Sequence, residues 1–273
     1  MRAAVLGRPV GHSLSPVLHS AAYAALGLAD WAYTAVDCGE DELAGFLAGL
    51  GPEWAGLSLT MPLKRVGLAA ADEVDPLADA VGAANTLLLG ERRTAYNTDV
   101  AGIAAALREA GTQSPRSAVL LGAGGTAQAA LAALVTLGIT NPVVLVRDVG
   151  RTGELRATAD RLGAELDLRA GLPGPVPAVD LVISTLPAGA ADELVPVGGV
   201  VLDVVYAPWP TRFAATAAAG GATVVSGLTM LLHQAAAQVD LMTGRTAPVE
   251  AMRQALDAAV RARTEKPPAP AAP

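Results

Sequence analysis

Lys64 and Asp99 are the residues of this sequence that most directly suggest acid–base chemistry. Lys266 is the only other lysine, and arginine supplies every other cationic side chain apart from histidine. An arginine keeps its proton under ordinary conditions, whereas a lysine can be tuned to exchange one. A lysine beside a carboxylate can deliver a proton to a developing alkoxide and remove it in the reverse reaction. We expect Lys64 and Asp99 to form such a pair, the alternative being that Asp99 is only a helix N-cap.

The places of these two residues along the chain support the pairing. Residues 54–59 are predicted to form a strand that runs into Thr60 and then Lys64, and residues 65–80 are expected to be helical. Asp99 precedes a further helix expected over residues 100–110. Sites in open α/β sheets are built beyond the carboxyl ends of the strands, which is where Thr60 and Lys64 fall.

A second group of polar residues suits a hydroxylated substrate that carries a carboxylate. Ser13 and Ser15 lie two residues apart in the loop after the first predicted strand, and two such hydroxyls can bind a carboxylate or a polyol. Ser15 is also suited to cap the helix that follows, because Pro16 fits a first helical turn. Further side chains that can hold hydroxyl groups are Thr60, Asn85 and Gln234.

Residues 119–127 carry the G-x-G-x-x-A spacing of a dinucleotide site, placed between an apolar strand and an alanine-rich helix. Gly122 permits the tight turn, Gly124 lets the backbone approach a pyrophosphate, and Ala127 lets helix and strand pack closely. The N-terminus of the helix then presents free N–H groups and the positive end of its dipole to the phosphates.

The surrounding elements predict an α/β protein with two domains. Apolar runs such as 1–6, 118–121 and 143–146 suit strands that are buried on both faces of a parallel sheet. From residue 117 onward, strands alternate with helices in the pattern of a doubly wound sheet. The turn-rich segment 111–116 is typical of a domain junction. At the end of the chain, residues 264–273 are expected to form a disordered tail.

Composition excludes several classes of protein. The chain is 52% hydrophobic, has a net charge of −7 without a cluster of basic residues, and contains a single cysteine, Cys38. An internal disulfide and a cysteine-based zinc site are therefore excluded, and nucleic acid is not an expected partner. Because no apolar run is long enough to span a membrane and no signal-peptide pattern is present, we expect a cytoplasmic protein, and we expect no metal site.

Six segments of the chain occur in the order and spacing of shikimate dehydrogenases, and the sequence resembles that family from residue 1 to about residue 255. Any one of these motifs is weakly specific, but together they are highly specific. They are Gly11-His12-Ser13-Leu14-Ser15-Pro16-x-x-His19, Leu59-Thr60-Met61-Pro62-Leu63-Lys64, Gly82-Ala83-x-Asn85-Thr86-Leu87, Asn97-Thr98-Asp99, Gly122-Ala123-Gly124-Gly125-x-Ala127 and Gly227-Leu228-x-Met230-Leu231-x-x-Gln234-Ala235-Ala236.

The resemblance implies reversible, NADP-dependent reduction of 3-dehydroshikimate to shikimate, a step of chorismate and aromatic amino-acid biosynthesis. It implies that Lys64 is the catalytic acid and base and that Asp99 orients both Lys64 and the substrate hydroxyl. Ser13 and Ser15 would bind the substrate carboxylate. The residues implied to contact the rest of the substrate are Thr60, Lys64, Asn85, Asp99, Tyr206 and Gln234.

The resemblance also implies the division of the chain into domains. A substrate domain would comprise residues 1–100 together with the returning segment 230–263, and a Rossmann-type NADP domain would comprise residues 101–229. The partner would be a small-molecule substrate, and the protein would be a monomer or a homodimer. The residues implied to bind the cofactor are Gly122, Ala123, Gly124, Gly125, Thr126, Ala127, Arg147, Arg151, Ser184, Gly227, Met230 and Leu231.

The segment after the strand at 143–146 bears on the choice between NADP and NAD. Arg147 and Arg151 would hold a 2′-phosphate through charge-assisted hydrogen bonds. Asp148 would repel that phosphate, and an acid near this position is how NAD enzymes bind the ribose 2′-hydroxyl. Two cations against one anion favour NADP, with NAD as the alternative because of Asp148.

Three further positions depart from the family pattern. Ser58 and Ser184 stand where relatives usually have asparagine, and Val100 replaces the glycine that normally follows Asn-Thr-Asp. None of these changes removes a proposed acid, base or ligand of the substrate carboxylate.

Other functions are compatible with parts of the sequence. A quinate/shikimate or aminoshikimate dehydrogenase that uses NAD is the rival within the class, although Ser15 stands where quinate-using relatives tend to have threonine. A non-catalytic NADP-binding sensor of the same fold would not need both Lys64 and Asp99. A methylene-tetrahydrofolate dehydrogenase would need other motifs in the N-terminal half.

Overall fold

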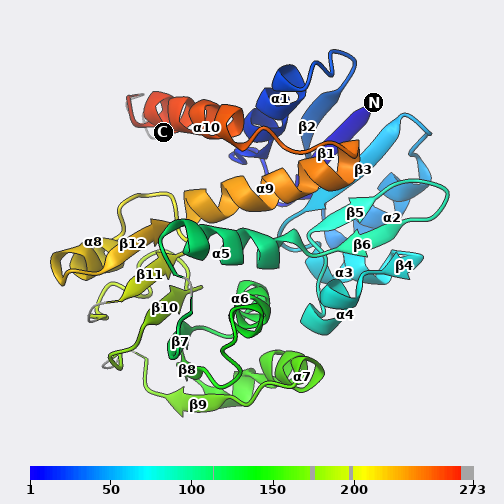
Figure 1. Ribbon diagram of the computed structural model, residues 1–273. Coiled ribbons are helices and arrows are strands. Elements are labelled where there is room, and N and C mark those ends of the chain that lie inside the picture. Colours follow the sequence, from blue (N-terminus) through cyan, green and yellow to red (C-terminus); the bar gives the residue numbers. More distant parts are fainter. Residues whose placement is uncertain (113, 173–175, 197–198, 266–273) are drawn as a thin grey trace, which may run out of the picture.

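The computed structural model describes residues 1–112, 114–172, 176–196 and 199–265, which form a mixed α/β protein with two six-stranded sheets (Figure 1). The strands of the first sheet are β1 (Arg2–Gly7), β2 (Ala32–Asp37), β3 (Trp54–Leu59), β4 (Glu73–Val74), β5 (Thr86–Leu88) and β6 (Thr94–Tyr96). Those of the second sheet are β7 (Ala118–Leu121), β8 (Val143–Val146), β9 (Asp167–Ala170), β10 (Leu181–Ser184), β11 (Val200–Asp203) and β12 (Thr223–Ser226). The helices are α1 (Ser15–Ala25), α2 (Glu40–Ala48), α3 (Lys64–Ala69), α4 (Pro76–Val81), α5 (Thr98–Glu109), α6 (Gly125–Thr136), the short 3₁₀ helix η1 (Val149–Arg151), α7 (Gly153–Leu162), α8 (Arg212–Ala219), α9 (Gly227–Thr243) and α10 (Val249–Glu265).

The first sheet is mixed, with the strand order β2-β1-β3-β5-β6-β4. Strand β1 lies parallel to both β2 and β3, whereas β5 runs antiparallel to β3 and to β6. Because parallel strands end at the same edge of a sheet, the loops that follow β1 and β3 emerge side by side. These loops are the segments that carry the serines and Lys64.

The helix expected over residues 65–80 is instead interrupted. Helix α3 ends at Ala69, the short strand β4 pairs with β6, and α4 begins at Pro76. Asp75 caps α4, because its side chain accepts hydrogen bonds from the N–H groups of Leu77 and Ala78. An aspartate followed by proline is a helix start signal, so the break was readable in the sequence.

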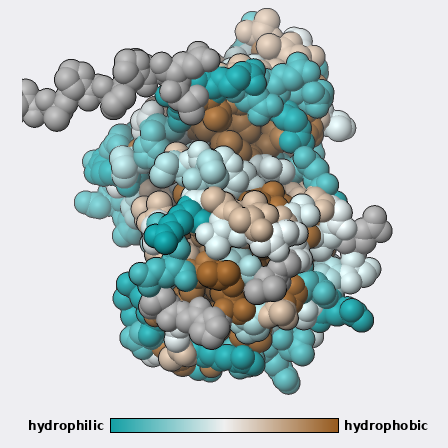
Figure 2. All heavy atoms as spheres, turned by 90° about the vertical axis from the view of Figure 1, so that its left-hand side faces the viewer, coloured by the Kyte–Doolittle hydropathy of each residue, from teal (hydrophilic) through white to brown (hydrophobic). Residues whose placement is uncertain are grey.

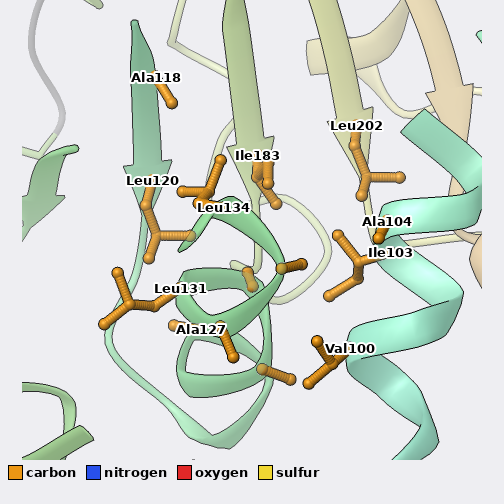
Figure 3. Packing of buried hydrophobic residues seen from close by; sticks show 14 of the residues in the cluster. Val100, Ile103, Ala104, Ala118, Leu120, Ala127, Leu131, Leu134, Ile183 and Leu202 are labelled. Atoms are coloured by element: carbon orange, nitrogen blue, oxygen red, sulfur yellow. The ribbon is translucent and has the colours of Figure 1, made fainter. Parts of the chain in front are cut away.

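The second sheet is parallel throughout, with the order β12-β11-β10-β7-β8-β9. This arrangement confirms the doubly wound pattern predicted from residue 117 onward. Helix α6 is almost entirely buried, and its alanines let α5 and the sheet approach closely. Figure 3 shows side chains from α5, α6 and three strands meeting in this core, among them Ile103, Leu120, Leu131, Ile183 and Leu202.

The two C-terminal helices follow the second sheet but pack against the N-terminal part of the chain (Figure 1). Helix α10 lies along α1, where Leu18, Met252 and Leu256 are buried together. Helix α9 crosses α5 at Gly102, where an added Cβ would lie 2.9 Å from the carbonyl oxygen of Met230. Helix α10 extends to Glu265, so residues 264 and 265 are helical rather than part of a tail, and residues 266–273 lie outside the described residues.

The capping alternatives for Ser15 and Asp99 are both wrong. The N-cap of α1 is Leu14, whose side chain makes no capping hydrogen bond. The N-cap of α5 is Asn97, whose side-chain oxygen accepts the N–H of Asp99 at 3.1 Å. Ser15 and Asp99 therefore lie inside the first turns of their helices, and neither side chain is used as a cap.

The described part of the chain contains no helix that is long and apolar enough to cross a membrane. Nor does that part contain a group of three or more His, Cys, Asp or Glu residues placed to hold a metal ion. Figure 2 views the molecule from the left-hand side of Figure 1, and hydrophilic residues cover much of that face, with apolar residues gathered in separate areas. Cys38 is a free, buried thiol.

Candidate active site

A cleft of about 380 Å³ brings together residues from the edge of the first sheet, from α6 and from α9. Its lining contains every residue that the sequence associated with the substrate and four of those associated with the cofactor. From the N-terminal part of the chain these are Ser13, Ser15, Thr60, Lys64, Asn85 and Asp99, and from the remainder Thr126, Tyr206, Gly227, Met230, Leu231 and Gln234.

Lys64 and Asp99 form the predicted ion pair in the lining of this cleft. Lys64 Nζ donates to Asp99 Oδ2 at 2.5 Å, and the two side chains are 25% and 7% exposed. Lys64 is the first residue of α3, held by a turn in which the N–H of Leu63 donates to the carbonyl oxygen of Thr60. Asp99 lies in the first turn of α5, where the helix dipole favours a carboxylate.

Asn85 completes the surroundings of the Asp99 carboxylate. Its Nδ2 donates to Asp99 Oδ1 at 2.9 Å, so that Lys64 contacts one carboxylate oxygen and Asn85 the other. The backbone N–H of Thr98 donates to Asn85 Oδ1 at 2.8 Å. Because a backbone N–H can only donate, this bond determines which end of the Asn85 amide faces Asp99.

Gln234 reaches the same group from a distant part of the sequence. Its Oε1 lies 3.3 Å from Asn85 Nδ2, and its Nε2 donates to the carbonyl oxygen of Leu231 within α9. The close crossing at Gly102 makes this contact possible, since a Cβ there would lie 2.8 Å from the Cβ of Gln234. Gln234 is buried and lies in the lining of the cleft.

The serine loop lies at another wall of the cleft. The backbone N–H of Ser15 donates to Ser13 Oγ at 3.2 Å, which leaves the hydroxyl proton of Ser13 free to be donated elsewhere. Ser15 is buried, and Ser13 is half-buried. Arg263 at the end of α10 donates to the carbonyl oxygen of His12 at 2.9 Å, which ties that cation to the loop. Two hydroxyls with a guanidinium nearby suit the binding of a carboxylate.

Tyr206 enters the cleft from the loop after β11. The loop is anchored at Asp203, whose carboxylate accepts hydrogen bonds from the Thr211 hydroxyl at 2.6 Å and from the N–H of Val205 at 3.1 Å. Burial raises the pKa of Asp203 and also that of Tyr206. Tyr206 therefore keeps its hydroxyl proton at neutral pH and can act as a hydrogen-bond donor.

The glycine turn before α6 has the geometry that a dinucleotide needs. Gly122 has a φ of +103°, and a Cβ there would lie 2.7 Å from Thr185 Oγ1, so only glycine fits without strain. Gly124 is the N-cap of α6, and a Cβ at this position would meet open space. The N–H groups at the start of α6 are thus accessible, and the turn fits a pyrophosphate.

Arg147 and Arg151 are exposed, and neither forms an ion pair with any other residue that the structure describes. Asp148, which separates them, uses its Oδ1 to accept the N–H of Gly150 at 2.8 Å and so caps the short helix η1. This capping bond gives Asp148 a local structural role. The pair of guanidinium groups fits the 2′-phosphate of NADP.

Ser184 is a proposed cofactor residue whose side chain the structure does not bring to the cleft surface. Its side chain is fully buried, and its hydroxyl has no hydrogen-bond partner among the described residues. It lines a separate small hollow together with Leu186 and Asp203. A contact between Ser184 and a nicotinamide ribose is therefore not favoured by this geometry.

Two buried polar residues that sequence reasoning did not propose also belong to the site. Gln238 and Ser58 lie in the lining of the cleft, although both side chains are buried. Gln238 follows Gln234 by one helical turn, and the spacing of four residues on a helix was the available signal. Ser58 was visible only as a departure from the family pattern.

Comparisons with known proteins identify the family. Residues 5–87 match a family model described as the shikimate dehydrogenase substrate binding domain, and residues 227–256 match the shikimate 5′-dehydrogenase C-terminal domain. A shikimate dehydrogenase (NADP(+)) of Moorella thermoacetica is 40% identical over 95% of this chain and 93% of its own length. The chain belongs to the shikimate dehydrogenase family.

Solved structures agree with this membership. The shikimate dehydrogenase of Mycobacterium tuberculosis has 42% sequence identity and a TM-score of 0.82, over 94% of this chain and 99% of that one. A shikimate 5-dehydrogenase of Thermus thermophilus, solved in complex with NADP(H) and shikimate, has 34% identity and a TM-score of 0.82. That match covers 95% of this chain and 99% of the Thermus chain.

Proposed function

We propose that this protein is an NADP-dependent shikimate dehydrogenase that interconverts 3-dehydroshikimate and shikimate in aromatic amino-acid biosynthesis. The observation that carries this proposal is the contact of Lys64 Nζ with Asp99 Oδ2 inside the cleft, with Asn85 on the other carboxylate oxygen. Relatives that cover nearly the whole chain are shikimate dehydrogenases that use NADP, which supports the same conclusion.

The proposed mechanism assigns proton transfer to the lysine. When bound, NADPH supplies a hydride to the carbonyl carbon, and NADP takes it back in the reverse direction. Lys64 Nζ donates a proton to the carbonyl oxygen during reduction and removes it from the hydroxyl during oxidation. Asp99 holds Lys64 in place, and its buried carboxylate also orients the substrate hydroxyl.

The remaining polar residues of the cleft are proposed to bind and orient the substrate. Ser13 and Ser15 would donate hydrogen bonds to its carboxylate, with Arg263 close to the same loop. Holding the ring in one orientation converts an encounter into a reaction of aligned groups. The residues proposed to fix the ring and its hydroxyls are Thr60, Asn85, Tyr206 and Gln234.

The proposed cofactor contacts combine backbone and side-chain groups. Residues 122–127 would bind the pyrophosphate through N–H groups at the start of α6. Arg147 and Arg151 would bind the 2′-phosphate, and the capping bond of Asp148 to Gly150 supports NADP over NAD because it engages one oxygen of the acid that would otherwise bind the ribose. Gly227, Met230 and Leu231 would contact the nicotinamide.

The domain division predicted from the sequence is part of the same proposal. Residues 1–100 with 230–263 would form the substrate domain, and residues 101–229 the NADP domain. The packing of α10 on α1, and of Leu232 and Ala235 of α9 in one cluster with Leu14 and Leu18, supports the return of the C-terminal helices to this domain. The cytoplasmic location, the absence of a nucleic-acid partner and the monomeric or homodimeric state stay predictions.

A single set of assays tests the function and its alternatives. Oxidation of shikimate and of quinate is followed at 340 nm with NADP and with NAD, which yields four rates. We expect shikimate with NADP to be the fastest pair. Faster turnover of quinate, or a clear preference for NAD, would favour the quinate/shikimate alternative, and no turnover of either substrate would favour the NADP-binding sensor.

A further inference from the structure

A buried hydrogen-bond chain runs from Tyr33 through Ser58, Gln238 and Thr86 to Asn85, next to the catalytic pair. Gln238 on α9 is 1% exposed and uses both ends of its amide. Its Nε2 donates to the backbone carbonyl oxygen of Asn85 at 3.1 Å and to Thr86 Oγ1 at 2.9 Å. Its Oε1 accepts from Ser58 Oγ at 2.8 Å.

The donors and acceptors in this chain have only one consistent direction. The carbonyl oxygen of Asn85 can only accept, so the nitrogen of the Gln238 amide must face Asn85 and Thr86. Thr86 Oγ1 accepts a hydrogen bond from Gln238 Nε2. The Thr86 hydroxyl therefore donates its own hydrogen bond to Asn85 Oδ1, at 2.9 Å. Each group thus passes a donated hydrogen bond to the next, in the direction of Asn85.

The same direction holds at both ends of the chain. Upstream, the Tyr33 hydroxyl donates to Ser58 Oγ at 2.6 Å, which leaves the Ser58 proton for Gln238. Burial raises the pKa of Tyr33, so its hydroxyl remains a donor. Downstream, Asn85 Nδ2 donates to the carboxylate of Asp99.

Thr86 can orient other residues of the site, but it does not contact the cleft itself. Its side chain is fully buried and does not line the cleft, so it can influence the substrate only through its hydrogen-bond partners Asn85 and Gln238. A hydrogen bond inside a protein is stronger than in water, and successive bonds polarise one another. Loss of the Thr86 hydroxyl would leave one N–H of Gln238 without its acceptor and would remove one of the donors that hold Asn85 Oδ1, beside the N–H of Thr98.

We propose that Thr86 and Gln238 are positioning residues for the reaction, which act together with the N–H of Thr98 to hold the Asn85 amide with its Nδ2 facing Asp99. This inference rests on the proposed function of the cleft. The chain keeps the Asp99 carboxylate in one orientation, with Asn85 on one oxygen and Lys64 on the other. Tyr33 and Ser58 act one step further back, by orienting Gln238.

The substitutions Thr86→Val and Thr86→Ser test this role as a matched pair. Valine has nearly the shape of threonine but lacks the hydroxyl, whereas serine keeps the hydroxyl and loses only a methyl group. We expect Thr86→Val to lower kcat for shikimate oxidation about tenfold, because a hydrogen bond in a charged network is lost. Thr86→Ser should stay within about twofold of the parent protein, and the KM for NADP should change in neither variant.

Thr158→Val is the control for the loss of a buried hydroxyl. Thr158 is also fully buried and takes part in a hydrogen-bond network, with Gln128 and with the carbonyl oxygen of Val81, but it does not line the cleft. A general loss of stability would lower the melting temperature of this variant and of Thr86→Val alike. Only the variant at position 86 should lose kcat.

A double variant gives a second test. If Thr86 and Gln238 both act through Asn85, Thr86→Val combined with Gln238→Met should lower kcat no further than the more damaging single substitution. Effects that multiply would overturn the proposal, as would a normal kcat for Thr86→Val or equal losses in Thr86→Val and Thr86→Ser. Failure of the parent protein to oxidise shikimate would instead refute the proposed function.

Discussion

The two sides of the cleft are built from different chemical groups. On the side of the first sheet, the site consists of side chains that bind one another, with Lys64, Asp99 and Asn85 buried or half-buried in a hydrogen-bonded group. On the side of the second sheet, it consists mainly of backbone, where Gly124 and Gly125 are exposed at the start of a helix.

This difference follows from what each side is proposed to do. Proton transfer requires a side chain of the right type held at the right angle, and a buried network supplies that orientation before the substrate arrives. Phosphate binding at a helix start uses N–H groups that every residue except proline possesses. The first side should therefore be sensitive to side-chain identity, and the second to backbone conformation.

The largest effect that tests this comparison is expected from Lys64→Ala. Proton transfer by a positioned group contributes about 10²- to 10⁴-fold, so kcat should fall by a factor in that range while the KM for shikimate and for NADP changes little. Steady-state kinetics in both directions provide the measurement. Arg65→Ala, at the adjacent exposed residue that pairs with Glu154, is the control and should leave kcat unchanged. Normal turnover in Lys64→Ala would refute the mechanism.

A second effect concerns the stability of the side-chain network at acid pH. His19 is fully buried, stacks on Tyr33 and approaches Gln238 Oε1 through Nε2, and its desolvation lowers its pKa from 6.5 to about 3. Between these values the unfolded chain binds a proton that the folded protein does not. The contribution of neutral His19 to the free energy of unfolding is therefore fully present above pH 6.5. As the pH falls from 6.5 towards 3, the free energy of unfolding decreases by about 1.4 kcal/mol per pH unit.

The variant His19→Phe should remove this part of the acid sensitivity. Phenylalanine keeps a ring against Tyr33 but does not titrate. Urea unfolding of both proteins between pH 4 and pH 7 gives the free energy of unfolding at each pH. We expect a shallower dependence on pH in the variant, and parallel curves for the two proteins would show that His19 does not contribute.

A smaller effect is expected on the backbone side, from Gly122→Ala. Alanine at a φ of +103° is strained, and its Cβ would press on Thr185, which should distort the turn and cost more than about 1 kcal/mol. We expect the KM for NADP to rise about tenfold, with the KM for shikimate unchanged. Gly138→Ala is the control, because Gly138 has a φ of +89° with no atom near its Cβ position. Equal rises in KM for both variants would contradict a specific role of the turn.

The smallest effect is expected from Asp148→Asn. Asparagine keeps an oxygen that can accept the N–H of Gly150 and so preserves η1, but it removes the negative charge between Arg147 and Arg151. Without that charge the preference for NADP over NAD, measured as the ratio of kcat/KM values, should rise about threefold. A fall in this ratio would indicate that Asp148 assists the binding of NADP.

The fold was predictable to the extent that each element carries a local signal. The strand, glycine turn and helix at residues 118–136 and the alternation that follows are set by hydrophobic runs and punctuating glycines, and the structure confirms them. The break between α3 and α4 was missed although Asp75 and Pro76 signal it. The alternative that Asp99 is the N-cap of α5 is wrong. Asn97 is the N-cap, because its side-chain oxygen accepts the N–H of Asp99.

The sequence by itself determined the chemical types available to this protein: a rare lysine, a carboxylate after a short strand, two loop serines and a glycine turn before a helix. Residue types and short spacings are local properties, and so they can be identified from the sequence without the three-dimensional structure. The tertiary structure decided how these groups combine. Lys64, Asp99 and Gln234 lie together because α3, α5 and α9 converge at one cleft. Gln238 donates hydrogen bonds to Asn85 and Thr86 although it is far from both in the chain.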